Sequence, residues 1–306
     1  MKLSGFARAV LAASFVAVPA SHATADSAEK FRAQVIVGYE KFGFERNEQD
    51  FIGGAEASDW NTYDLAVSGA YDIDKKTAVA FDFDLSRFNT SGVEPGEIED
   101  DSPKEDRTVG LSLLRKVGSD QLLSLGVSRG FIANTQREQD ARKSFSAVDL
   151  AFAHQVSQWS YMVSVGQIFN GSQETQDALI RGRYYGLDAD YSVNEQVTLG
   201  VSLDRFRGDE FDEGERKSSQ SSQVLDLFGQ YQLGDHFLRA GIRQHDNKRE
   251  DVAGSNIGDI EKADGRGFYL SYAIPFGGSA RKLERMILTS RPNKTEFANV
   301  GGSTMD

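Results

Sequence analysis

The chain has 306 residues, a formal net charge of −12 at pH 7 and no cysteine. The acidic balance argues against nucleic acid as a partner, because its phosphates would repel the protein. Without cysteine the fold is no disulfide scaffold, and thiol chemistry and cysteine zinc sites are excluded.

The first 25 residues have the pattern of a cleaved secretory signal peptide. Lys2 and Arg8 form a basic segment, AVLAASFVAV (9–18) is an apolar run, and ATA (23–25) is a small-x-small cleavage site. The apolar run is too short to span a bilayer. We therefore expect residues 1–25 to be removed on export, which takes the net charge of the mature chain to −14.

One segment shows the pattern that dominates the rest of the chain. In TAVAFDFDLSRF (77–88), apolar residues such as Phe81 and Phe83 alternate with the acidic Asp82 and Asp84. Successive side chains of a strand point to opposite faces, so this strand is apolar on one face and acidic on the other. In a soluble sandwich the apolar face would point into a core, whereas in a membrane barrel it would point into lipid.

Alternation of this kind predicts twelve strands in chain order. They cover residues 31–44, 61–73, 77–88, 107–117, 121–131, 144–156, 159–169, 181–192, 197–206, 223–233, 236–245 and 267–276. The five prolines all avoid the middle of a predicted strand, as a ladder of backbone hydrogen bonds requires.

The predicted connections alternate in length along the whole chain. Tight turns are expected at 74–76, 118–120, 157–158, around Asn194-Glu195 and at 234–235, and longer polar loops around 45–59, 89–106, 132–143, 170–178, 208–221 and 246–264. Both chain ends then lie on the short-turn side. A soluble sandwich has no reason to sort its loops by length and should show Greek-key crossings, so this alternative is disfavoured.

This arrangement resembles the class of bacterial outer-membrane β-barrels, which are porin-like and have short periplasmic turns, long outer loops and an even number of antiparallel strands. The resemblance covers residues 31–276 and includes a final strand that ends on an aromatic residue, Phe276. It implies an all-β fold, a single up-and-down antiparallel transmembrane barrel over residues 26–278, in the outer membrane. In most of that class the chain stops at the terminal aromatic residue, whereas here thirty residues follow.

The faces opposite the apolar ones would line the barrel interior, the lumen. They combine many small residues with an excess of carboxylates over basic groups. The predicted pore-lining residues are Glu40, Asp64, Asp82, Asp84, Asp188, Asp190, Asp204, Asp226, Arg239 and Arg243. Twelve strands lie between small barrels filled by their own side chains and wide porins. Either the lumen is a narrow aqueous passage that favours cations, or its acids pair with Arg32, Arg239 and Arg243 and plug it.

Two acidic clusters are predicted in the outer loops, at 94–106 and 209–215. Carboxylates of this kind suit the divalent cations that bridge lipopolysaccharide, but neither cluster has EF-hand spacing, and a solvated, repulsive loop is the simpler interpretation. The sequence implies no cofactor and no defined metal site.

A lipid-modifying barrel enzyme is a further alternative. His245, beside Asp246, is the single histidine expected at the outer rim of the lumen, and no G-x-S-x-G elbow accompanies it. His154 and His236 lie next to short turns, away from substrates in the outer leaflet.

Residues 279–306 form a tail on the periplasmic side, with a short helix predicted over 280–290. Leu283, Met286 and Ile287 would share one face, and Arg281, Lys282 and Arg285 make the helix basic. Either this helix enters the mouth of the acidic lumen and restricts flow, or it is a solvated tail.

From these features we expect a non-enzymatic, porin-like channel for passive diffusion of small polar or cationic solutes. The alternative is a closed structural or interaction barrel. Outer-membrane lipid and lipopolysaccharide are the expected surroundings, and the oligomeric state is not fixed by the sequence.

Overall fold

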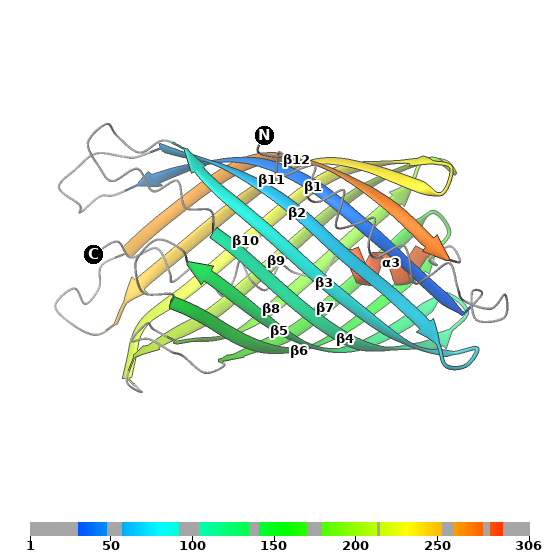
Figure 1. The fold of residues 1–306 in the computed structure, drawn as a ribbon, viewed down its shortest axis with the longest axis horizontal. Helices are drawn as coiled ribbons and strands as arrows, with labels where there is room; N and C mark the ends of the chain where they lie inside the picture. Colours follow the sequence, from blue (N-terminus) through cyan, green and yellow to red (C-terminus); the bar gives the residue numbers. More distant parts are fainter. Residues whose placement is uncertain are drawn as a thin grey trace, which may run out of the picture.

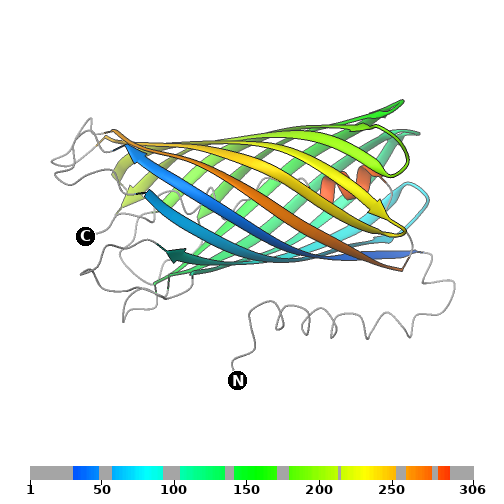
Figure 2. The same ribbon diagram turned by 90° about the horizontal axis from the view of Figure 1, so that it is seen from above.

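The computed structural model describes residues 30–47, 57–91, 104–134, 141–170, 179–212, 215–252, 260–277 and 282–289. They form a closed β-barrel with one short helix (Figures 1 and 2). The strands are β1 (Phe31–Asn47), β2 (Ala57–Asp72), β3 (Thr77–Ser91), β4 (Lys104–Gly118), β5 (Gln121–Asn134), β6 (Ala141–Val156), β7 (Trp159–Asn170), β8 (Leu179–Ser192), β9 (Val197–Asp212), β10 (Glu215–Leu233), β11 (His236–Asp251) and β12 (Ile260–Gly277). The helix is α3 (Lys282–Thr289).

Each strand pairs antiparallel with its neighbours in sequence, and β1 closes the barrel against β12. The closing ladder runs from the pair Arg32 and Gly277 to the pair Asn47 and Lys262. Closure leaves no strand edge unpaired, which is the condition for a sheet to stand in a bilayer. The predicted up-and-down antiparallel barrel of twelve strands is therefore confirmed.

The strands extend further toward the long-loop end than the alternation predicted. The largest difference lies at 208–221, where the prediction of a long polar loop is wrong. There β9 continues to Asp212 and β10 begins at Glu215, with a bulge between Arg216 and Ser218. This extension has polar residues on both faces, so the apolar half of the strand pattern is missing from the sequence.

The outer face of the barrel is apolar, as a lipid-facing surface must be. Large side chains such as Leu111, Leu125, Val163 and Ile242 are each about half exposed, with fractions from 50% to 60%. Outward aromatic residues lie near both ends of the strands. Toward the short turns these are Tyr71, Trp159 and Tyr231, and toward the long loops Phe131 and Phe169. Aromatic residues prefer the two membrane interfaces.

Among the described residues, no helix is long and apolar enough to cross a membrane.

Two of the short turns are built in the same way. Asp74 Oδ1 accepts hydrogen bonds from the backbone N–H groups of Lys76 and Thr77, at 2.6 and 2.8 Å. In the turn between β8 and β9, Asn194 Oδ1 accepts the equivalent bonds from Gln196 and Val197, both at 2.8 Å. Side chains of Asp and Asn stabilise tight turns by such local bonds, so these residues fix the hairpin registers.

Large inward aromatic side chains lie over glycines of neighbouring strands. A Cβ atom added at Gly166 of β7 would come within 2.1 Å of the Tyr184 ring on β8, and one at Gly182 within 2.3 Å of the Phe206 ring on β9. Tyr184 and Phe206 are fully buried. The glycines therefore make room for an aromatic layer on the inner wall, which narrows the lumen.

Candidate functional site

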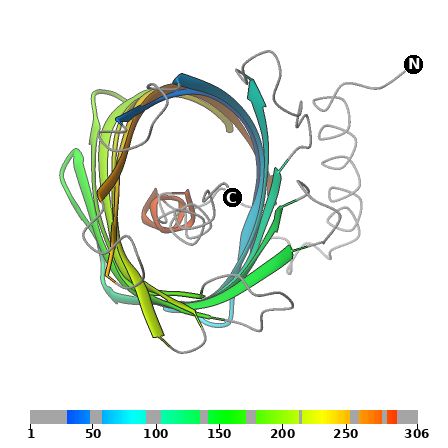
Figure 3. The same ribbon diagram turned by 90° about the vertical axis from the view of Figure 1, so that its left-hand side faces the viewer.

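Helix α3 lies inside the barrel, in the half nearer the short turns (Figures 1 and 3). It packs against the inner faces of β5, β6 and β7. The predicted short helix is thus present, and of the two positions considered for it, the structure shows the one within the barrel. This end of the lumen is the candidate functional site, because any solute passing along the barrel axis must pass α3.

An apolar seat on the wall receives the apolar face of α3. Met286 is 3% exposed and Ile287 is fully buried. They join a cluster with inward alanines and larger residues from six strands: Ala70, Ala78, Ala80, Leu114, Leu122, Ala151, Ala153 and Met162. Burial of each of these two helix side chains contributes about 2 kcal/mol. Alanines suit the seat because their short side chains leave room for a helix against the wall.

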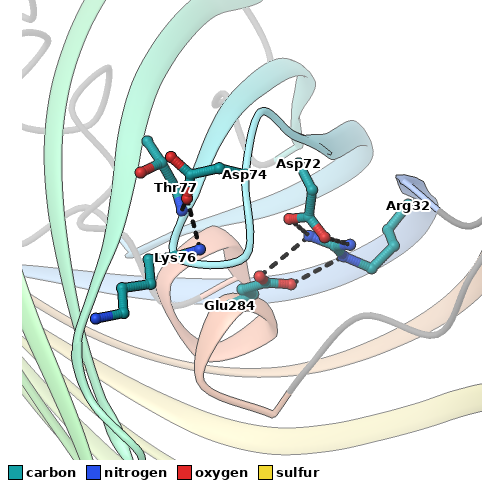
Figure 4. A network of polar contacts seen from close by, with 6 residues as sticks. All are labelled: Arg32, Asp72, Asp74, Lys76, Thr77 and Glu284. Carbon is teal, nitrogen blue, oxygen red and sulfur yellow. Dashed lines mark hydrogen bonds and ion pairs between the residues drawn. The ribbon is translucent and has the colours of Figure 1, made fainter.

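A buried ionic network ties α3 to the start of the barrel (Figure 4). Arg32 of β1 donates from Nε to Glu284 Oε2 at 3.0 Å and from Nη2 to Glu284 Oε1 at 3.1 Å. The same guanidinium donates to both carboxylate oxygens of Asp72 at the end of β2, at 2.8 and 2.7 Å. Arg32 is 4% exposed and Glu284 is 2% exposed. Bidentate pairing of this kind fixes geometry as well as adding energy.

The basic side chains of α3 make separate contacts with the wall. Lys282 Nζ donates to Ser192 Oγ at 2.7 Å. The Arg285 guanidinium carbon lies 4.0 Å from the centre of the Phe237 ring on β11, in a cation–π contact. Burial, together with the positive charge of Arg239, lowers the pKa of Arg285 to about 10. α3 therefore brings two cationic groups into this end of the barrel.

The ten predicted pore-lining residues all lie at strand positions that alternate with the outward apolar side chains. Five of them are buried acids, each at most 8% exposed: Glu40, Asp82, Asp188, Asp190 and Asp226. Asp204 is half-buried. Asp64 is half-buried too, and Asp84 is exposed. Since Asp84 follows the buried Ala80 and Asp82 on the same face of β3, its exposure marks a solvent-accessible part of the inner wall.

The two predicted arginines are placed in different surroundings. Arg243 donates to Glu40 Oε2 at 2.9 Å and lies 3.7 Å from Asp226 Oδ2, which also accepts a 2.9 Å hydrogen bond from the Tyr269 hydroxyl. Arg239 donates to Gln230 Oε1 at 3.3 Å and stacks on Phe228 at 4.0 Å. The structure thus brings Glu40, Asp226 and Arg243 into one network, while Arg239 stands apart from it.

The remaining predicted features are also located. His245 is buried and packs edge-on against Phe42, with 4.4 Å between ring centres. Of the acidic cluster at 209–215, Asp209 lies on β9 and pairs with Arg216 at 2.7 Å, and most of the cluster at 94–106 lies outside the described residues, as do residues 1–25. Within the described part of the chain, no group of three or more His, Asp or Glu side chains could hold a metal ion.

The most important residue missed from the sequence is Glu284. The tail was interpreted as a basic amphipathic helix, and its one acid was not connected with Arg32. A signal was present, because Glu284 is the single acid in a basic helix and Arg32 was one of few inward basic residues. The small inward residues were interpreted as lining of the lumen and not as a helix seat.

The sequence matches no protein-family model and no curated protein. The fold is similar to an outer-membrane channel from Pseudomonas putida F1, with 14% identity and a TM-score of 0.58 over 80% of this chain and 95% of that chain. It also matches a FadL homologue from Pseudomonas aeruginosa, with 12% identity and a TM-score of 0.45 over 81% of this chain and 90% of that one. At such identities the likeness concerns the fold alone. The fold is that of the bacterial outer-membrane β-barrels.

Proposed function

We propose that the protein is an outer-membrane channel through which small polar solutes, cations among them, cross by diffusion, and that α3 narrows its periplasmic end. The observation that carries this proposal is a closed barrel with an apolar outer face and an inner wall whose charged residues include the solvent-exposed Asp84. A barrel that served only as a membrane anchor would not require a solvated, charged inner wall.

The acidic wall supports a preference for cations in the middle of the barrel. Asp64, Asp84 and Asp204 are accessible or half-buried on this wall. Charged rings of one sign raise the local concentration of the opposite ion.

A closed interaction barrel is the second candidate, and the seating of α3 favours it. Arg32, Glu284, Met286 and Ile287 are all buried, so the helix is held firmly at the short-turn end. In this alternative the barrel would be a platform for the outer loops, and solutes would not pass.

Planar-bilayer recording of the refolded mature chain, residues 26–306, separates the two. The channel proposal expects steady conductance, with a reversal potential under a potassium chloride gradient that shows cation preference. A barrel that folds, as judged by heat-modifiable gel mobility, but stays silent both with and without residues 279–306 would support the interaction barrel. A silent full chain that conducts once the tail is deleted would show a channel closed by α3.

A further inference from the structure

Two arginines at the level of α3 form no ion pair with a carboxylate within the described part of the chain. Arg285 makes a cation–π contact with Phe237, and Arg239 makes one with Phe228 and a hydrogen bond to Gln230. Neither guanidinium forms an ion pair there, unlike Arg32 and Arg243. Stacking on a ring covers one face of each guanidinium, and the N–H groups in the guanidinium plane can still donate hydrogen bonds to a ligand.

These two side chains lie close to each other. Phe237 and Arg239 are alternate residues of β11, so they point to the same face about 7 Å apart along the strand. Arg285 sits on the Phe237 ring, on the same inner face of β11 as Arg239. Burial lowers the pKa of Arg285, and the positive charge of Arg239 lowers it further.

A third basic group and two acids complete the cluster. Lys282 is one turn before Arg285 on α3 and is held by Ser192 at 2.7 Å. Asp190 of β8 interacts electrostatically with Arg239, Lys282 and Arg285. Asp188, two residues earlier on the same face of β8, also interacts with Arg239. Three cations therefore share two carboxylates, and a local excess of positive charge remains in a barrel wall that is otherwise acidic.

We propose that Arg239, Arg285 and Lys282 form a binding site for a small oxyanion, a carboxylate or phosphate group of a solute, at the narrow end of the lumen. Paired guanidinium groups are suited to such anions because their N–H groups match carboxylate and phosphate oxygens. The anion would relieve the repulsion between the two arginines. This inference rests on the proposed function, since the solute reaches the site through the lumen, and it adds a class of solute: small organic anions, or zwitterions whose cationic part meets the acidic wall.

Calorimetric titration of the folded mature chain in detergent with sodium phosphate, and separately with sodium succinate, tests binding without any current. Saturable binding is expected, weakened at least tenfold in Arg239→Gln and in Arg285→Gln. Arg285→Lys keeps the positive charge but loses the paired N–H donors of the guanidinium, and it should bind with intermediate affinity. The matched control is Arg115→Gln, which removes one positive charge at the exposed turn beside Asp74 and should bind like the wild type. Each variant is first checked for heat-modifiable mobility.

The outcomes separate the site from the channel. Phosphate binding that survives Arg239→Gln and Arg285→Gln, or an absence of binding in the wild type, overturns the site whether or not the barrel conducts. If phosphate binding requires both arginines but the barrel conducts no current, the anion site is supported and the proposed channel function is refuted. In a conducting barrel, phosphate should reduce the current of the wild type and of Arg115→Gln at millimolar concentration, and should leave the current of Arg239→Gln unchanged.

Discussion

Arg32 and Glu284 are 252 positions apart in the sequence and meet through two hydrogen bonds of 3.0 and 3.1 Å inside the barrel. Arg32 belongs to the first strand and Glu284 to the helix that follows the last strand. The pair therefore joins the first strand of the barrel to the helix that follows the last strand, at the short-turn side.

Glu284→Gln should loosen α3 without unfolding the barrel. The substitution removes a charge from a buried pair but leaves Arg32 its two bonds to Asp72, so the helix should lose about 1–3 kcal/mol of docking free energy. Since each 1.4 kcal/mol is tenfold in an equilibrium, trypsin should cleave after Lys282 or Arg285 roughly ten times faster. The control is Glu195→Gln in an exposed turn, and equal cleavage rates in both variants would contradict the role of the pair.

The barrel could be predicted from sequence because its signals are local. Alternation with period two, as in Phe81 to Asp84, and turn residues such as Asp74 and Asn194 act within a few residues of each other. The position of α3 depends on contacts between residues far apart in the chain, such as Glu284 with Arg32 and Ile287 with the buried cluster on the wall. No local pattern encodes these contacts. The extension of β9 and β10 was missed because its inward Ser218 and Gln220 are as polar as a loop.

Ile287→Ala should weaken the seating of α3 from the apolar side. Ile287 is fully buried against the alanines of the wall, and loss of a buried isoleucine side chain costs about 2–4 kcal/mol. Leu288→Ala is the matched control, because Leu288 is half-buried and lies at the edge of the same cluster. In planar bilayers Ile287→Ala should increase the time spent at high conductance, with a smaller effect for Leu288→Ala.

The same docking can be disrupted from the wall. Ala80 is fully buried in the helix seat, so Ala80→Phe should fill the space of α3 and displace it while the tail stays intact. The expected result is a conductance close to that of the chain lacking residues 279–306. If Ala80→Phe has wild-type conductance and trypsin cleaves it after Arg285 no faster than the wild type, the seat does not hold the helix.

The turn at Asp74 gives a pH prediction. Hydrogen bonds from the backbone N–H groups of Lys76 and Thr77, that of Lys76 being the larger effect, lower the pKa of Asp74 below its ordinary value of 3.8. A carboxyl group with a lowered pKa in the fold stabilises it above the ordinary pKa, and this contribution is lost as the pH falls through the lowered one. Asp74→Asn keeps the acceptor oxygen, as Asn194 does in its own turn.

Urea unfolding of wild type and Asp74→Asn should therefore differ little at pH 7. Any greater stability of the wild type than of Asp74→Asn should disappear as the pH falls below about 4. Asp74→Ala removes the acceptor and should be less stable than Asp74→Asn at both pH values. An advantage of the wild type over Asp74→Asn that grows on acidification would have the wrong sign for this mechanism.

Asp84→Asn should reduce the cation preference of the channel. Asp84 is the exposed acid of the inner wall, so its charge acts on ions in the lumen, and the reversal potential in 0.1 M potassium chloride should move toward that of chloride. The shift should shrink in 1 M salt, where the Debye length falls from about 10 Å to about 3 Å. The control is Asp235→Asn, in an exposed turn at the end of the barrel. It changes the net charge by the same amount and should shift the reversal potential less.

Gly166→Val should destabilise the barrel through the aromatic layer. Its Cβ would meet the fully buried Tyr184 ring at 2.1 Å, and overpacking of this kind costs about 1–3 kcal/mol. The matched control is Gly229→Val on β10, where the nearest atom to an added Cβ is Leu199 Cδ2 at 3.7 Å, and a β-branched residue there suits a strand. Urea unfolding followed by heat-modifiable mobility should show a lower midpoint for Gly166→Val alone. Equal midpoints for the two variants would mean that Tyr184 can leave its place over Gly166 at no cost, and the aromatic layer would then be no fixed constriction of the lumen.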